Sequence, residues 1–369
     1  MKIYKKITVL FLSASLIFSS ASGCAQTQYP DIVDMSSFNT ISKLVIGRNL
    51  RSSMTKKEYD ALSEYFTKRL SELSRMYDIY YEYSGINNLK TINMNAGISP
   101  VKVSKEIIDL LELSIEIYDM TDGRVNIAYG SVLSVWHTYR NDGKGTSIPS
   151  AAELKEAQKH TDIRGLVIDR ENSEVFLKDK NMSLDVGAVA KGYAAELIHN
   201  ELSQMGYNGL LIDLGGNIRL LQGTDSNSGH KFNVGITDPA DPDKYPPDLK
   251  VSLENGSVVS SGDYQRYYIV DGKRYHHIID PETNMPGQYH RAVGVICESS
   301  ALADVYSTYL FILSTEEGKK FCEKVGAEAV WFEPDGAIIF TDGFPKMQSA
   351  RHVLYQSRSS ADKIFSLLA

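Results

Sequence analysis

The stretch LLIDLGGNIRLL, from Leu210 to Leu221, has the pattern of two short strands joined by a tight turn. Gly215 and Gly216 separate the two apolar runs, and glycine suits such a turn because its central residues need positive φ angles. Three further hairpins are predicted around Asn-Gly or Asp-Gly pairs: Lys250–Leu253 with Ser257–Ser261, Tyr267–Val270 with Lys273–Ile279, and Ala329–Phe332 with Ala337–Thr341. Antiparallel pairing is therefore expected in the sheets.

Amphipathic helices are predicted on both sides of these hairpins. Thr55 and Glu58 have the spacing of a capping box, and apolar residues follow at helical intervals as far as Tyr77. The other predicted elements are helices at Ser104–Tyr118, Ala151–Lys159, from near Gly187 to just before Gly206, Ala301–Leu313 and Thr315–Val325, and a strand at Ala292–Cys297. The predicted helices and strands do not alternate as in βαβ units, and the sequence contains no periodic repeat. Their order therefore predicts an α+β fold of mixed or antiparallel sheets packed against helices.

The composition is that of an ordinary globular protein. The chain has 369 residues, of which 43% are hydrophobic and 23% charged, and its formal net charge is −7. A mildly acidic chain without a basic block does not suit nucleic-acid binding. No CxxC motif or Cys/His cluster indicates zinc or an iron–sulfur centre, and Cys297 and Cys322 are expected to be buried free thiols, although a disulfide between them is possible.

The N-terminus predicts export. Three lysines within the first six residues precede an apolar run from Ile7 to Phe18, which is too short to span a bilayer core of about 30 Å. The run leads to Ala21-Ser22-Gly23-Cys24, which is similar to a bacterial lipobox, although Ala21 replaces the more usual Leu. We expect residues 1–23 to be a lipoprotein signal peptide, Cys24 to be lipidated, and residues 24–36 to tether the protein to the extracytoplasmic side of the cell membrane. Ordinary signal cleavage beside an incidental cysteine is the alternative.

The stretch DVGAVAKGY at 185–193 is a candidate phosphate site. Asp185 is followed by a turn of small residues and then by a predicted helix, whose N-terminus offers unpaired N–H groups. Gly187 and Ala188 would let a phosphate approach closely, and Lys191 would add a positive charge. Alternatively, Asp185 merely caps the helix and the small residues pack it on a sheet. The spacing is neither that of a Walker A loop nor that of GxGxxG.

Two further stretches contain glycine turns or histidines. LGGNI at 214–218 is first of all a hairpin turn, but its glycines could also let a ligand approach the main chain. SSGDYQR at 260–266 is followed by His276 and His277 at the end of a predicted strand. On a regular strand His277 would face away from both His276 and Ile278. A single strand histidine is usually structural, whereas this pair beside a turn is a candidate for proton transfer.

The stretch ADVYST at 303–308 could bind a metal ion. Asp304 and Thr308 are four residues apart and share one face of a predicted helix. A carboxylate, a hydroxyl and a main-chain carbonyl together form an oxygen site that suits Mg²⁺ better than zinc. The alternative is that Asp304 simply caps the helix.

Taken in order, these stretches resemble the ApbE family of FAD:protein FMN transferases. DVGAVAKGY, LGGNI, SSGDYQR, HIIDPETNMP (277–286) and ADVYST carry the resemblance, and VNIAYGSVLSVW (125–136) is a weaker match. It covers residues 37–345 and leaves 346–369 as a C-terminal extension. It implies an enzyme that uses Mg²⁺ to transfer the FMN half of FAD onto a threonine hydroxyl of a target protein, with release of AMP.

The resemblance also assigns roles to single residues. Contacts with FAD fall on Phe38, Asn126, Ile127, Ala128, Asp185, Lys191, His277 and Ile278. Magnesium ligands fall on Ala188, through its main-chain carbonyl, and on Asp304 and Thr308. His277 is in addition the candidate proton acceptor for the incoming threonine.

The chain departs from the family pattern at three places. Phe38-Asn39-Thr40 stands where Met-Gly-Thr is usual, so the contact of Phe38 with FAD is in question. Asn126 replaces a frequent Asp. Asn284 replaces a Gly in the turn after Pro281, and because Asn tolerates the left-handed conformation, we expect this turn to be kept.

Two other functions use the same residues. A magnesium-dependent FAD pyrophosphatase would transfer the FMN to water, and a flavin-binding lipoprotein would capture FAD without chemistry. For the transferase, the resemblance implies as partner an exported or membrane electron-transfer protein that carries a threonine acceptor motif.

Overall fold

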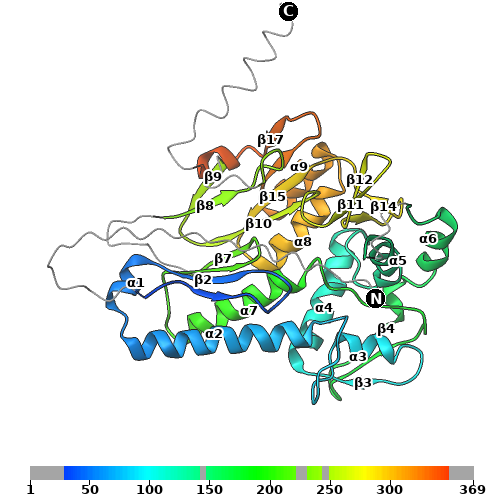
Figure 1. The fold of residues 1–369 in the computed structure, drawn as a ribbon, viewed down its shortest axis with the longest axis horizontal. Helices are drawn as coiled ribbons and strands as arrows, with labels where there is room; N and C mark the ends of the chain where they lie inside the picture. Colours follow the sequence, from blue (N-terminus) through cyan, green and yellow to red (C-terminus); the bar gives the residue numbers. More distant parts are fainter. Residues whose placement is uncertain (1–28, 142–146, 222–230, 243–248, 349–369) are drawn as a thin grey trace, which may run out of the picture.

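An eight-stranded sheet is the centre of the molecule (Figure 1). The structure is a computed structural model that describes residues 29–141, 147–221, 231–242 and 249–348. All neighbouring strands of the sheet are antiparallel. In spatial order they are β1 (Ile32–Asp34), β2 (Ser42–Ile46), β6 (Leu210–Leu214), β7 (Asn217–Leu221), β10 (Gly256–Gly262), β15 (Ala292–Cys297), β16 (Glu328–Phe332) and β17 (Ile338–Phe340).

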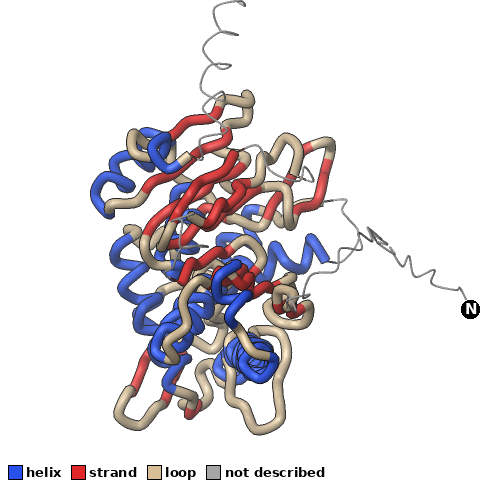
Figure 2. The backbone as a smooth tube through the Cα atoms, turned by 90° about the vertical axis from the view of Figure 1, so that its left-hand side faces the viewer, coloured by secondary structure: helices blue, strands red, loops and turns tan. Residues whose placement is uncertain are grey.

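Helices cover one face of this sheet. The helices α7 (Ala190–Gln204) and α8 (Ser300–Phe311) pack on the sheet and on each other, and the long α2 (Lys56–Met76) contacts α7 and β1. The opposite face is covered by the hairpin of β8 (Phe232–Ile236) and β9 (Leu249–Leu253) and by the short helix η2 (Phe344–Met347). Figure 2 shows the arrangement after a quarter turn, with helices in blue and strands in red.

Smaller elements complete the fold beside the sheet. The two strands β11 (Tyr267–Val270) and β12 (Lys273–His276) form a hairpin that packs against α5 through aromatic rings. The remaining elements are the helices α1 (Arg48–Ser53), α3 (Leu89–Met94), α4 (Lys105–Met120), α5 (Gly130–Asn141), α6 (Ala151–Gln158), η1 (Ile163–Gly165) and α9 (Thr315–Val325), and the strands β3 (Val101–Lys102), β4 (Leu166–Asp169), β5 (Glu174–Leu177), β13 (Ile279–Asp280) and β14 (Met285–Pro286).

Most predicted elements are present, and the α+β class is confirmed. Thr55 and Glu58 form the predicted capping box at the start of α2. The helix expected near Gly187 begins three residues later, at Ala190, because Asp185–Val189 forms a turn in which Asp185 accepts the Gly187 N–H at 2.8 Å. Val189 is the N-cap, so the alternative that Asp185 caps this helix is wrong.

The hairpin predicted around Asn255-Gly256 is wrong. Both strands form, but β9 pairs with β8, whereas β10 pairs with β7 on one edge and β15 on the other. Because both edges of β10 are occupied, β9 cannot join it. Gly256, with φ at +99°, turns the chain from one layer to the next.

The diglycine turn is confirmed as a hairpin turn between β6 and β7. Gly215 and Gly216 have φ angles of +64° and +92°. A Cβ atom on Gly215 would lie 2.1 Å from Oγ1 of Thr40. The absence of a side chain at Gly215 therefore lets the loop around Thr40 approach the sheet closely.

Cys297 and Cys322 are both free, as expected, but only Cys322 is fully buried, whereas Cys297 is partly buried. In the part of the chain that the structure describes, no helix is both long and apolar enough to cross a bilayer. Cys24 and the predicted signal peptide lie outside the described residues.

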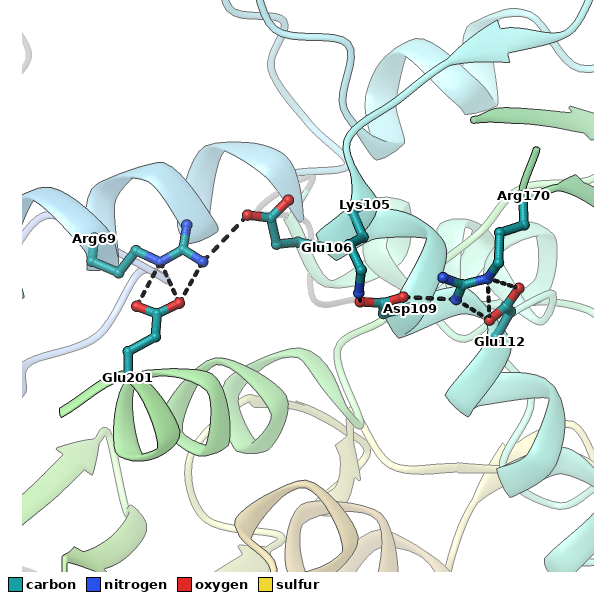
Figure 3. Close-up of polar contacts among 7 residues, drawn as sticks. All are labelled: Arg69, Lys105, Glu106, Asp109, Glu112, Arg170 and Glu201. Atoms are coloured by element: carbon teal, nitrogen blue, oxygen red, sulfur yellow. Dashed lines mark hydrogen bonds and ion pairs between the residues drawn. The ribbon is translucent and has the colours of Figure 1, made fainter. Parts of the chain in front are cut away.

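Ion pairs connect α7 to α2, and α2 to α4 (Figure 3). Arg69 of α2 contacts Glu201 of α7 at 2.7 Å and Glu106 of α4 at 3.3 Å. In the same picture, Arg170 pairs with Asp109 and Glu112 of α4. The Arg69 side chain is only 15% exposed, so its pairs are screened less than surface pairs. This network holds the helix that begins at the candidate site.

Candidate active site

One cavity of about 390 Å³ gathers nearly all the predicted site residues. Its walls come from the loop after β1, the end of α2, the start of α5, the turn before α7, the β10–β11 loop, the segment after β12 and the middle of α8. The predicted residues that line it are Phe38, Asn126, Ile127, Asp185, Ala188, Lys191, His277, Ile278, Asp304 and Thr308. Ala128 does not line it: this residue is fully buried, and its N–H donates to Oδ1 of Asn126 at 2.8 Å.

Asp304 lies between α8 and the start of α7. Its side chain is almost fully buried, and Oδ2 accepts the main-chain N–H of Gly192 at 2.9 Å. Oδ1 lies 3.4 Å from Nζ of Lys191. Ser299 is the N-cap of α8, so the alternative that Asp304 is a helix cap is wrong. The carboxylate instead lies beside the first turn of α7, where the helix dipole stabilises negative charge.

The donor atoms around Asp304 fit a magnesium ion. Ala188 and Thr308 line the same cavity, and no hydrogen bond within the described residues engages the Thr308 hydroxyl. No group of three or more His, Cys, Asp or Glu side chains in this part of the chain could hold a metal. A site with one carboxylate and neutral oxygens suits Mg²⁺, which keeps several waters and completes its shell with substrate phosphates.

His277 faces the cavity as a neutral base. Burial, followed by the charges of Arg266, His276, Arg140 and Lys191, lowers the pKa of His277 to about 3. Nδ1 is enclosed and has no hydrogen-bond partner among the described residues, so Nε2 is the ring nitrogen that reaches the cavity. A neutral imidazole at physiological pH can accept a proton.

His276 has a structural role instead. Its Nε2 bonds to the carbonyl of Gly287 at 2.8 Å, and its ring packs edge-on against Phe311. The strand ends at His276 and resumes at Ile279. Because of this break, the predicted alternation fails, and both His277 and Ile278 border the cavity.

The cavity is also lined by polar residues for which no role was predicted. His137 and Arg140 lie one helical turn apart on α5, and Arg266 lies in the loop between β10 and β11. The hydroxyl of Tyr80, in the segment after α2, lies 3.4 Å from Nδ1 of His137. The helical spacing of Leu133, His137 and Arg140 was the available signal, since residues three and four apart share a face.

Comparisons with known proteins identify the family of the chain. The model of the ApbE family matches residues 40–331. This chain belongs to the ApbE family. An FAD:protein FMN transferase of Klebsiella pneumoniae (strain 342) is 32% identical over 258 residues, which are 69% of this chain and 78% of that protein. An Escherichia coli (strain K12) protein of the same name is 26% identical over 346 residues, which are 92% and 96% of the two chains.

Solved structures show the same fold. The crystal structure of an ApbE protein from Thermotoga maritima superposes with a TM-score of 0.75 at 26% identity, and the match covers 87% of this chain and 100% of that one. The flavin transferase ApbE from Vibrio cholerae gives a TM-score of 0.71 at 21% identity, with 86% and 98% covered.

Two departures from the ApbE pattern have a visible explanation. Asn284 has a φ of +57°, so the expected left-handed turn is kept without glycine. Phe38 and Asn39 have φ angles of +53° and +51°, and Phe38 packs near Tyr77 with ring centroids 6.4 Å apart. Two consecutive left-handed residues are unusual outside glycine, and such strain is often found at ligand sites.

Proposed function

We propose that this protein transfers the FMN half of FAD onto a threonine hydroxyl of a target protein, with Mg²⁺ and with release of AMP. The observation that supports this most is the convergence of Asp304, Lys191 and His277 on one cavity, from three separate segments. These are the groups that the reaction requires, since phosphoryl transfer depends on positioning and charge neutralisation more than on covalent help. The names of the relatives support the coarser part of this proposal, which is the transfer of FMN from FAD to a protein.

Each end of the substrate has candidate partners in the cavity. Phe38 and Tyr77 give an apolar wall of the kind that suits a flat ring system. Lys191, at the second position of α7, places an ammonium group where phosphates would approach the helix N-terminus. Asp304, Thr308 and the carbonyl of Ala188 would hold the Mg²⁺, which would neutralise charge on the phosphate oxygens.

His277 would activate the acceptor. Its imidazole is neutral in the free protein, where burial and the surrounding cations lower its pKa. The negative phosphates of bound FAD would raise this pKa toward the range of a general base, so that Nε2 could take the proton from the threonine hydroxyl. General base catalysis of this kind contributes about 10²- to 10⁴-fold in rate. Arg124 of the cavity wall pairs with both Asp280 and Glu282, and these ion pairs hold the segment that follows His277.

The location and partner are part of the same proposal. The predicted signal peptide and Cys24 support a lipid-anchored protein outside the cytoplasm, where an exported or membrane electron-transfer protein with a threonine acceptor would be the target. Membrane fractionation of the full-length protein checks the anchor: Cys24→Ser should move it from the membrane to the soluble exported fraction. A variant that stays in the membrane would exclude lipidation at Cys24.

Incubation with FAD, Mg²⁺ and a flavin-acceptor domain, followed by in-gel flavin fluorescence and AMP quantification, tests the activity. We expect covalent fluorescence on the acceptor and one AMP per flavin. AMP and FMN without labelled protein would show a pyrophosphatase instead, and FAD binding without AMP would show a carrier. An acceptor in which the threonine is replaced by alanine is the matched control.

A further inference from the structure

Arg140 and Arg266 are positive charges that the cavity does not neutralise. Neither guanidinium forms an ion pair with a carboxylate within the described residues. The other two cations of the cavity wall differ, since Lys191 faces Asp304 and Arg124 pairs with Asp280 and Glu282. Because Arg140 is half-buried without an ion-pair partner, its charge is costly, and an anionic ligand would offset that cost.

The charges of the two arginines both influence His277. Arg266 and Arg140 are both among the charges that lower the pKa of His277, and Arg266 also contributes to the lowered pKa of Arg140, after burial. The carboxylate of Asp185 lines the same cavity and its charge partly offsets that of Arg140, but its Oδ1 accepts the Gly187 N–H. Within the described residues it forms no hydrogen bond or ion pair with either arginine. The positive field near His277 is thus left for a ligand.

The fold supplies this pair from two distant elements. Arg140 lies on the same face of α5 as His137 and is half-buried, whereas Arg266 is exposed in the β10–β11 loop. One guanidinium is therefore inside the cavity wall and the other at its rim. A guanidinium fork matches the oxygens of a phosphate group bidentately, which a lysine cannot do.

We infer that Arg140 and Arg266 form a phosphate clamp that binds the phosphate of the departing adenosine monophosphate. This inference rests on the proposed function and assigns the leaving-group side of the same cavity. In the proposed transfer, the threonine Oγ forms a bond to the phosphorus of the FMN half, and the bond from that phosphorus to the bridging oxygen breaks. The electron pair stays on the bridging oxygen, which leaves with AMP, and the threonine proton goes to Nε2 of His277.

Charge is the physical reason for a clamp at this place. FAD enters with two negative charges on its pyrophosphate, whereas AMP leaves as a phosphate monoester with close to two negative charges of its own, and the new phosphodiester keeps one. The negative charge on the phosphates therefore rises by one during the reaction. Two preorganised guanidiniums would stabilise this developing charge more in the transition state than in bound FAD.

Binding measurements with three probes test the clamp: FAD, AMP and riboflavin. The variants are Arg140→Gln, Arg266→Gln and the double variant, with Arg164→Gln as a control that removes an 86%-exposed arginine far from the cavity. We expect the double variant to bind AMP at least about tenfold more weakly, riboflavin to be bound equally by all variants, and Arg164→Gln to behave as wild type. Arg266→Lys should recover only part of the AMP affinity, because the fork is lost.

The outcomes separate the clamp from the activity. If wild type binds FAD but the double variant binds AMP as tightly as wild type does, or if wild type itself does not bind AMP, the clamp is excluded while the proposed function stands. If wild type does not bind FAD at all, the proposed function fails. A loss of affinity for riboflavin and AMP alike, or a lowered thermal midpoint, would show a folding defect and would also exclude a specific clamp.

Discussion

The main-chain N–H of Gly192 donates to Oδ2 of Asp304 across 2.9 Å, and this bond joins two helices that are 112 residues apart in the chain. A Cβ atom on Gly192 would lie 2.3 Å from the carbonyl oxygen of Ser300 and 2.6 Å from Cβ of Asp304. Glycine at this position therefore permits the close approach of α7 and α8. The same contact fixes the orientation of the carboxylate that we assign to Mg²⁺.

Gly192→Ala should weaken metal binding and also lower the stability of the fold. The added methyl group pushes α8 away from α7, so Asp304 loses its N–H partner and its orientation. We expect the apparent Kd for Mg²⁺, measured by magnesium titration of FAD binding, to rise by about tenfold, which corresponds to about 1.4 kcal/mol. Asn200→Ala, on an exposed position of the same helix, is the control. Unchanged magnesium affinity in Gly192→Ala would show that this contact does not position the ligand.

Asp304→Asn tests the metal site without changing the shape of the side chain. The amide can still accept the Gly192 N–H, but it loses the negative charge that attracts Mg²⁺. In wild type, Mg²⁺ should tighten FAD binding, and EDTA should remove this gain. In the variant, FAD titrations followed by flavin fluorescence should give the same binding curve in Mg²⁺ as in EDTA. A variant that still responds to Mg²⁺ like wild type would place the ion elsewhere.

Acid should destabilise the fold through His277. The unfolded chain binds a proton at the ordinary histidine pKa near 6.5, whereas the pKa of folded His277 is lowered to about 3 by burial and neighbouring cations. Between these values the unfolded state binds more protons, so the free energy of unfolding falls as the pH is lowered through this window. The contribution of one such group is at most about 1.4 kcal/mol per pH unit.

His277→Gln should therefore flatten this pH dependence. Urea unfolding of both proteins at several values between pH 7 and pH 5 provides the comparison, and the slope, not the absolute stability, is the readout. Parallel slopes would mean that His277 is not the group that titrates. His276 keeps part of the slope in the variant, because burial lowers its pKa as well.

Asn284 combines a left-handed backbone with side-chain bonds to two other segments. Its Nδ2 donates to Gln158 at 2.9 Å, Tyr129 donates to its Oδ1, and its carbonyl accepts the Trp136 indole N–H at 3.0 Å. Asn284→Gly loses the side-chain bonds, each worth about 1 kcal/mol, but fits the positive φ. Asn284→Ala loses the same bonds and adds about 1 kcal/mol of backbone strain. Thermal unfolding should rank wild type above Gly and Gly above Ala, and an alanine variant as stable as the glycine variant would contradict this.

Local sequence determined where several helices and turns of this protein form. Thr55 and Glu58 specify the start of α2 because a capping box involves only four residues. The left-handed turn at Asn284 and the diglycine turn follow in the same way from the backbone preferences of single residues. The ordered motifs then sufficed to place Asp185, Lys191, His277 and Asp304 among the candidates for one site.

The tertiary structure determined which strands pair and which distant residues share one site. The Asn255-Gly256 signal did not predict the partners of β9 and β10, because strand pairing depends on which edges distant strands leave open. The tertiary structure also determined which histidine faces the cavity. Because the strand breaks after β12, His277 lines the cavity and His276 does not. The placement of Arg140 and Arg266 on one cavity and the contact of Gly192 with Asp304 have no local signal. Each arises only when the whole chain packs and closes a loop of more than a hundred residues.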